Sequence, residues 1–267
     1  MTLRVGIAGA GGRMGRALLE AASGTEGVAV GAALDVAGTP WIGRDAGELC
    51  AGVRGVKVGS DVAAALSACD LLIDFTRPEG TLAHVAACRA ARKKLVIGTT
   101  GFKPEEVARI REAAKDIAIV MAPNMSVGVN VALKLVDLAT RALGPDYDIE
   151  VFEMHHKLKV DAPSGTALKL GEAAAKARGT TLERDGAYAR HGVTGERKAG
   201  AIGFSVARGG DVVGDHTVYF AAAGERVEIT HRATSRTNFA QGAIRAAKFL
   251  QARPAGLYDM EDVLGLR

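Results

Sequence analysis

One short segment, Glu153–Ala167, concentrates residue types that can do chemistry, and its sequence is EMHHKLKVDAPSGTA. His155 stands beside His156, and Lys157 and Lys159 follow at once. Paired histidines suggest a metal site first, but adjacent strand residues point to opposite faces, so the two rings cannot easily chelate one ion. The segment offers no His-x-x-x-His spacing and no nearby cysteine, and its lysines would repel a cation. We therefore predict no bound metal.

The same segment suits proton transfer and anion binding. Histidine titrates near neutral pH and can supply or remove a proton, while nearby lysines attract an anionic substrate. Ser164 is a natural N-cap, and Gly165 and Thr166 would open a helix with exposed amide groups. Such a helix start can bind a carboxylate. A capped helix with merely solvated His and Lys side chains explains the same residues almost as well.

A glycine-rich turn, GIAGAGGRMG, follows the first predicted strand and opens the first predicted helix. Gly9 and Gly11 fit the dinucleotide fingerprint G-x-G-x-x-G, but Met14 occupies the third glycine position. The spacing G-x-x-G-x-x-G is met instead by Gly9, Gly12 and Gly15. Because the turn lies in a βαβ unit, it favours dinucleotide binding over an ordinary glycine turn.

Asp35 ends the second predicted strand, and a carboxylate at this place can accept hydrogen bonds from the adenosine ribose. It would also repel a 2′-phosphate, and the next residue, Val36, supplies no compensating charge. The local chemistry points to NAD, although Arg13 could hold the phosphate of NADP. A solvated aspartate at a strand end is the plainer alternative.

Two further strand ends, GTTGF (98–102) and APNMS (122–126), should face the same crevice. Gly98, Thr99 and Thr100 could approach a nicotinamide, and Asn124 offers both a donor and an acceptor. Each residue alone could be an ordinary loop residue, so position rather than type supports this prediction.

Hydrophobic periodicity predicts two domains that meet near residues 124–127. In the first, strands alternate with helices, which indicates a Rossmann-like, doubly wound parallel sheet in an α/β fold. The strands are predicted at 3–9, 28–35, 69–76, 94–101 and 117–124, and the helices at 15–23, 61–68, 78–92 and 103–115. The second is predicted as an α+β domain with a mixed sheet. Its strands are expected at 148–156, 201–209, 216–223 and 225–233, and its helices at 126–144 and 164–179, with a final helix at 237–253.

Composition narrows the class of protein. The 267 residues are 48% hydrophobic and 24% charged, and a net charge of +4 is scattered along the chain. No nucleic-acid or membrane partner is expected. The three cysteines lie far apart, which favours a reduced compartment, and the apolar run beginning at Leu3 leaves no room for a signal peptide. We predict a cytoplasmic protein whose mild positive charge is most simply a solvated mixed surface and leaves room for a small anionic ligand.

Taken together, five segments resemble the 4-hydroxy-tetrahydrodipicolinate reductase (dihydrodipicolinate reductase) family of bacterial lysine and diaminopimelate synthesis. They are the glycine turn, IDFTRPEGT (73–81), VIGTTGF (96–102), EMHHKLKVDAPSGTA and ITHRATSRTNFAQGA (229–243). The similarity extends nearly end to end, to YDMEDVL (258–264). The pattern H-H-x-x-K-x-D-x-P-S-G-T is far more specific than a glycine turn. The resemblance implies that NADH or NADPH delivers hydride to C4 of a cyclic imine dicarboxylate, with loss of the 4-hydroxyl as water.

The resemblance also assigns roles to individual residues. His155 would donate or accept the proton, and Lys159 would assist as a cation near the substrate. Arg236 is similar to the family's second carboxylate clamp, which suits its planar guanidinium. The other implied substrate contacts are His156, Ser164, Gly165 and Thr166. The implied cofactor contacts are Gly9, Ala10, Gly11, Gly12, Arg13, Met14, Asp35, Gly98, Thr99, Thr100, Ala122, Pro123, Asn124 and Met125.

One departure from the family concerns the cofactor. Members that use NADPH well often carry Glu-Arg where this chain has Asp35-Val36, so we expect NADH to be used at least as well as NADPH. The resemblance further implies a homotetramer and a discontinuous nucleotide domain of residues 1–126 and 236–267, with a substrate and oligomerisation domain at 127–235. The competing hypotheses are an NAD(H)-sensing protein without catalysis and a two-domain reductase of another aspartate-derived substrate.

Overall fold

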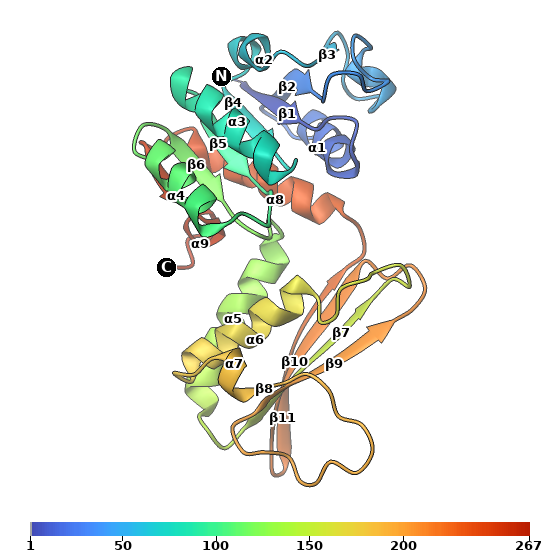
Figure 1. Cartoon of the computed structure of the whole chain (residues 1–267), viewed down its shortest axis with the longest axis vertical. Helices are drawn as coiled ribbons and strands as arrows, with labels where there is room; N and C mark the ends of the chain where they lie inside the picture. The colour runs from blue at the N-terminus through green and yellow to red at the C-terminus, as the bar shows by residue number, and fades with distance from the viewer. Residues whose placement is uncertain (1) are drawn as a thin grey trace. The chain divides into compact units, whose positions relative to one another are not determined.

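The structure, a computed structural model, describes residues 2–267, which divide into two compact units (Figure 1). Residues up to Val127 and residues 236–267 form the first unit, and residues 128–235 form the second. The first unit is discontinuous because the chain returns to it after completing the second. None of the helices in the described residues combines the length and the apolar character needed to cross a membrane.

The first unit is built on a parallel sheet of seven strands. These are β1 (Leu3–Ala8), β2 (Val28–Leu34), β3 (Val58–Gly59), β4 (Leu71–Asp74), β5 (Lys94–Ile97), β6 (Ala118–Met121) and β12 (Gly256–Tyr258). Their order is β12-β6-β5-β4-β1-β2-β3, and every neighbouring pair is parallel. All four residues of β4 are buried, as expected of a central strand that is covered on both faces.

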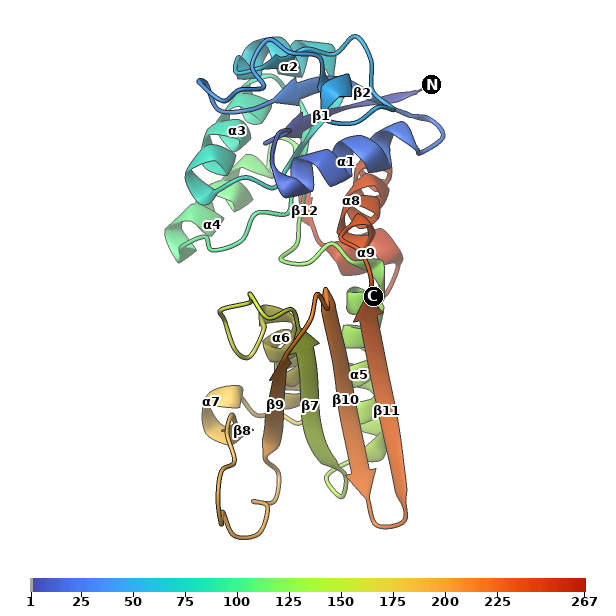
Figure 2. The ribbon, with the colours of Figure 1, turned by 90° about the vertical axis from the view of Figure 1, so that its right-hand side faces the viewer.

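Helices cover both faces of this sheet (Figure 2). They are α1 (Arg13–Ser23), α2 (Val62–Ala68), α3 (Pro78–Ala90), α4 (Pro104–Ala113), α8 (Thr237–Leu250) and α9 (Met260–Leu264), with a short 3-10 turn η1 (Ala46–Glu48). One apolar core includes Leu18 of α1 and Ile244 of α8. A separate core on the other face includes Val85 of α3 and Ile110 of α4. The helices therefore hold the carboxyl ends of the strands in fixed positions.

The predicted Rossmann-like class is confirmed, but several predicted strands are too long. The strand predicted at 94–101 ends at Ile97, and the one predicted at 69–76 ends at Asp74. The residues beyond them are loops at the carboxyl edge of the sheet. The elements β3, β12 and α9 were not predicted, because elements of two to five residues are too short to show a hydrophobic period.

The second unit contains a mixed sheet of five strands, as predicted for its class. These are β7 (Asp148–His155), β8 (Gly186–Ala187), β9 (Ile202–Arg208), β10 (Gly214–Ala222) and β11 (Glu225–Ala233). Their order is β11-β10-β7-β9-β8. Strand β10 runs antiparallel to β7 and β11, whereas β9 runs parallel to β7 and β8. Neither β8 nor the short helix α7 (Leu182–Asp185) was predicted.

One face of this second sheet packs against the helices α5 (Val127–Leu143) and α6 (Gly165–Ala177) (Figure 2). Burial alternates along β7, so that every second residue faces this apolar core. Ile149 and Val151 follow the pattern with apolar side chains. Glu153 and His155 continue it with polar ones. The end of β7 therefore places an acid and a histidine where a core would ordinarily continue.

Candidate active site

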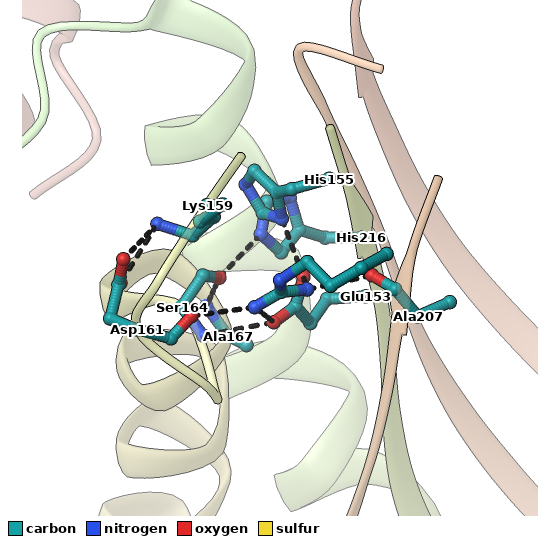
Figure 3. Close-up of polar contacts among 9 residues, drawn as sticks. Glu153, His155, Lys159, Asp161, Ser164, Ala167, Ala207 and His216 are labelled. Atoms are coloured by element: carbon teal, nitrogen blue, oxygen red, sulfur yellow. Dashed lines mark hydrogen bonds and ion pairs between the residues drawn. The ribbon is translucent and has the colours of Figure 1, made fainter. Parts of the chain in front are cut away.

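Glu153 lies at the centre of a cluster of polar contacts in the second unit (Figure 3). It is fully buried, yet its two oxygens accept hydrogen bonds from three neighbours. Arg208 donates to Oε2 at 2.9 Å and to Oε1 at 3.0 Å, and the Ser164 amide donates to Oε1 at 3.0 Å. Nδ1 of His155 lies 2.5 Å from Oε2. Burial raises the pKa of Glu153, but the hydrogen bonds from these donors lower it by more than burial raises it. The pKa of Glu153 therefore lies below its ordinary value. Glu153 is thus an anion at neutral pH.

This contact settles which His155 nitrogen can react. Because an ionised carboxylate only accepts hydrogen bonds, Nδ1 of His155 carries a hydrogen toward Glu153. The other nitrogen, Nε2, is the one that can exchange a proton with a substrate. It lies beside Gly214 of β10, where a Cβ atom would stand 2.9 Å from it. A side chain at position 214 would crowd Nε2 of His155.

A second buried histidine, His216 of β10, completes the cluster. Its ring meets that of His155 edge-on, with the ring centroids 5.0 Å apart. Its Nε2 lies 3.0 Å from the Ser164 hydroxyl. Burial, together with repulsion from the His155 ring, lowers the pKa of His216 to about 4. His216 is therefore a neutral structural partner at physiological pH.

Ser164 joins this cluster to the start of α6. Its hydroxyl caps the helix by accepting a hydrogen bond from the Ala167 amide at 3.1 Å. Gly165 is exposed at the first turn, and apart from its chain neighbours and the backbone of its own helix, no atom lies within 4 Å of the place where its Cβ would stand. Thr166 follows it and is half-buried. The predicted serine cap is confirmed, and the open first turn can accept an anionic group.

Lys159 lies in the turn between β7 and α6 (Figure 3). Its Nζ is 2.8 Å from both carboxylate oxygens of Asp161. The hydrogen bond from Lys159 is the main reason that the pKa of Asp161 lies below its ordinary value. Arg208 reaches the same turn, where it donates to the Asp161 carbonyl at 2.6 Å. His156 stands half-buried just beyond the end of β7.

The donor atoms of Glu153, His155 and His216 lie within 4.8 Å of one another, a spacing that could hold a metal ion. The chemistry of the set does not fit one. Both oxygens of Glu153 are already occupied by donors, two of them from the Arg208 guanidinium. A cation here would have to displace a buried positive charge. The cluster is better suited to proton transfer than to metal binding.

In the first unit, the glycine turn forms a tight loop between β1 and α1. Gly9 has a φ of 72°, and a Cβ on Gly15 would stand 2.1 Å from the Gly9 carbonyl oxygen. Only glycine fits both positions. Arg13 and Met14 open α1, with Arg13 exposed. The helix start can therefore receive a phosphate, as the sequence predicts.

Asp35 is fixed against this turn. Its Oδ2 accepts a hydrogen bond from the Gly11 amide at 2.8 Å, and its Oδ1 accepts one from the Val36 amide at 2.8 Å. A pocket of about 290 Å³ opens beside it, with Gly9, Val36 and His84 among its lining residues. The position suits the ribose and base of an adenosine.

The loops after β5 and β6 differ in what they present. Thr100 and Pro123 are exposed, Gly98 and Asn124 are half-buried, and Thr99 is buried. Ala122 and Met125 are buried within the apolar core of the sheet. The side chain of Met125 therefore serves packing, and its backbone is the part that can meet a cofactor.

A buried acid in the first unit that was not predicted as a site residue, Asp74, lies at the carboxyl end of β4. His84 lies 2.7 Å from its Oδ2, and the Thr76 amide and hydroxyl donate to its Oδ1. Burial raises the pKa of Asp74, but these contacts lower it by more. The Thr99 hydroxyl belongs to the same network, through Thr81 at 2.8 Å. Asp74 thus orders the loop that carries Thr99.

Glu153, Arg208 and His216 were also missed in the second unit. A signal existed for two of them, because Glu153 and His216 stand at inward-facing positions of their strands. A polar residue at such a position needs a partner, which points to a site. Arg208 carried no comparable signal. The predicted residues His155, Lys159 and Ser164 do lie together in this unit, whereas Arg236 directly precedes α8 in the first unit.

Comparison with known proteins identifies the family. A dihydrodipicolinate reductase N-terminal model matches residues 3–125, and the corresponding C-terminal model matches residues 128–264. The 4-hydroxy-tetrahydrodipicolinate reductase of Nitrosospira multiformis is 56% identical over 266 residues, covering 100% of this chain and 99% of that protein. That of Aromatoleum aromaticum is 58% identical over 267 residues, covering 100% and 97%.

Solved structures support the fold. A dipicolinate-bound dihydrodipicolinate reductase from Paenisporosarcina sp. TG-14 has a TM-score of 0.79 at 23% identity, covering 98% of this chain and 99% of that one. A scyllo-inositol dehydrogenase from Lactobacillus casei with bound NAD(H) has a TM-score of 0.59 at 14% identity, covering 99% and 93%. The two family models span nearly the whole chain, and the curated relatives match it end to end. The chain therefore belongs to the dihydrodipicolinate reductase family, and its activity is that of an NAD(P)H-dependent 4-hydroxy-tetrahydrodipicolinate reductase.

Proposed function

We propose that His155 supplies the reaction proton through its Nε2 and that Lys159 acts beside it as a cation facing the substrate. The observation that carries this proposal is the buried contact between Glu153 and His155, which leaves Nε2 as the exchangeable nitrogen. The start of α6 lies next to this pair, through the hydrogen bond from the Ser164 amide to Glu153.

The chemistry requires one hydride and one proton. The 4-hydroxyl and a hydrogen of the neighbouring ring carbon leave together as water, which forms a double bond conjugated with the imine. Hydride from the nicotinamide would then add to C4, and the electron pair of that double bond would move into the imine system. The resulting anion is neutralised by one proton. A protonated His155 is a suitable donor, and a nearby ammonium group stabilises the negative charge as it forms.

For the substrate's carboxylates, we assign the first turn of α6 as one binding site. The amides of Gly165 and Thr166, the Thr166 hydroxyl and Ser164 would hold one group together with His156, and Arg236 would hold the second. Lys159 is held by Asp161, and a carboxylate of the substrate would compete for the same ammonium.

The cofactor in this proposal is NADH or NADPH, bound by the glycine turn, Asp35 and the two loops at residues 98–100 and 122–125. NADH is used at least as well as NADPH, because Asp35 would repel a 2′-phosphate and Val36, which is 74% exposed, offers no cation. Steady-state kinetics with both cofactors test this preference. A strong preference for NADPH would contradict it.

We also propose a cytoplasmic homotetramer that associates through the sheet of the second unit, in lysine and diaminopimelate biosynthesis. The three cysteines are unpaired, which suits a reducing compartment. On β7, Phe152 points to the face opposite the buried Glu153 and is 37% exposed. Light scattering should give the mass of four chains, and a monomeric mass would exclude this assembly.

The His155→Gln variant tests the catalytic proposal. Glutamine is similar in size and polar but does not titrate, so we expect turnover to fall by at least about 100-fold. Binding of NADH and of dipicolinate, measured by calorimetry, should stay close to wild type. Near-normal turnover in a variant that binds both ligands would exclude the proton role of His155.

A further inference from the structure

The strongest unassigned feature of the second unit is the contact of Glu153 with Arg208. Both Glu153 oxygens are engaged by the guanidinium, in a two-pronged pair at 2.9 and 3.0 Å. Glu153 is fully buried, and the Arg208 side chain is only 20% exposed. A buried carboxylate of this kind is usually neutralised by its partner, because an unpaired buried charge is strongly disfavoured.

Arg208 also reaches past Glu153 to the loop that carries Lys159. One of its nitrogens donates to the Asp161 carbonyl at 2.6 Å, two residues beyond Lys159. The same side chain therefore contacts the acid beside His155 and the backbone beside Lys159. No proton transfer requires Arg208 itself, so its value lies in where it holds these two groups.

We propose that Glu153 and Arg208 are a positioning pair for the reaction. Glu153 orients the His155 ring with its hydrogen on Nδ1, and Arg208 fixes the position of Glu153 relative to the loop that carries Lys159. This inference rests on the proton role proposed for His155. Glu153 acts through His155 and touches no substrate atom. Its negative charge also stabilises the imidazolium from which the proton is given.

The effect of Glu153 on proton transfer by His155 depends on the other charged groups around the His155 ring. Glu153 on β7 places a negative charge against the ring, Arg208 on β9 pairs its positive charge with Glu153, and Lys159 in the following turn pairs with Asp161. His216 on β10 faces the ring edge-on. Since Glu153 is the negative group in direct contact with His155, its removal takes that negative charge away from the ring.

The Glu153→Gln variant tests the pair. Glutamine keeps the shape but removes the charge, and its amide can donate to Nδ1 and stabilise the wrong tautomer. We expect kcat to fall by about 100-fold, at the lower end of the range for general acid–base catalysis. The alkaline limb of the kcat/KM profile, where the proton donor is lost, should move to lower pH. The KM for the dicarboxylate and the affinity for dipicolinate should change by less than about threefold, because Glu153 acts through His155 and touches no substrate atom.

Two variants serve as controls. Glu153→Asp retains the charge and should return the limb toward its wild-type pH, although its shorter side chain lowers kcat. Glu150→Gln is the matched control, because Glu150 lies on the same strand and pairs with Arg190 and Arg197, but points to the opposite face. It should leave kcat and the pH profile unchanged.

The outcomes separate this inference from the role of His155. If His155→Gln is inactive while Glu153→Gln keeps wild-type kcat and an unmoved limb, the positioning role is wrong and the proton role stands. If His155→Gln remains active, the proton role fails first. Should Glu153→Gln not fold, nitrogen-15 NMR of the wild-type protein decides: a His155 hydrogen on Nδ1 supports the pair, and a hydrogen on Nε2 alone overturns it.

Discussion

At the scale of single residues, the site depends on polar groups in positions that ordinarily hold a core. Glu153, His155 and His216 all face the apolar side of the second sheet, and each is stabilised by a neighbour. His155 could be found from its sequence motif, because a doubled histidine with following lysines is unusual. Arg208, the partner of Glu153, could not be found in this way, since their contact joins residues 55 positions apart.

A pH dependence of stability follows from His216. Burial, the larger cause, and the nearby His155 ring lower its pKa from 6.5 to about 4. In the unfolded chain His216 becomes protonated below pH 6.5, whereas in the folded protein it stays neutral until about pH 4. Stability is therefore lost as the pH falls through this window, by up to about 3 kcal/mol.

The His216→Gln variant should lose less of its unfolding free energy than wild type between pH 7 and pH 4.5, as measured by urea denaturation at each pH. His191→Gln is the control, because His191 is exposed. Parallel stability curves for wild type and His216→Gln would show that burial of His216 is not coupled to folding in this way.

At the scale of elements, the structure depends on close backbone packing that no periodicity reveals. The sequence predicted a helix at 237–253, and α8 begins at the predicted residue but ends at Leu250, because 14 residues are long enough to show a helical period although their end is not marked. The sequence could not predict that α8, at Gly242, lies close to the backbone of the loop that follows β6. A Cβ at that position would stand 1.8 Å from the Met125 carbonyl oxygen. Similarly, β12 joins the sheet through its pairing with β6, and its three residues are too few for the sequence to predict that contact.

The Gly242→Ala variant should therefore destabilise the first unit. The added methyl group meets a backbone atom that cannot rotate away, so we expect a loss of about 1–3 kcal/mol and a lower melting temperature. Gln241→Ala, at the adjacent exposed position of the same helix, should change stability by less than about 0.5 kcal/mol. Equal melting temperatures for the two variants would mean that α8 does not pack as described.

At the scale of the whole molecule, the residues proposed to bind the cofactor and those proposed to transfer the proton lie in different units. The first carries the glycine turn and Asp35, whose geometry suits a dinucleotide, and the second carries the proton-transfer cluster. The alternation of strands and helices made the parallel sheet predictable. The hydrogen bonds that tune the cluster were not, because they join β7 to β9, β10 and the start of α6, whose side-chain contacts depend on the folded arrangement.

The central claim is that His155 gives the proton that accompanies hydride transfer. The pH profile of kcat/KM, measured for wild type and His155→Gln with freshly generated substrate and NADH, tests it most directly. We predict that wild type loses activity through an alkaline limb and that this limb is absent from the residual activity of His155→Gln. An unchanged limb at near-normal activity in the variant would contradict the account.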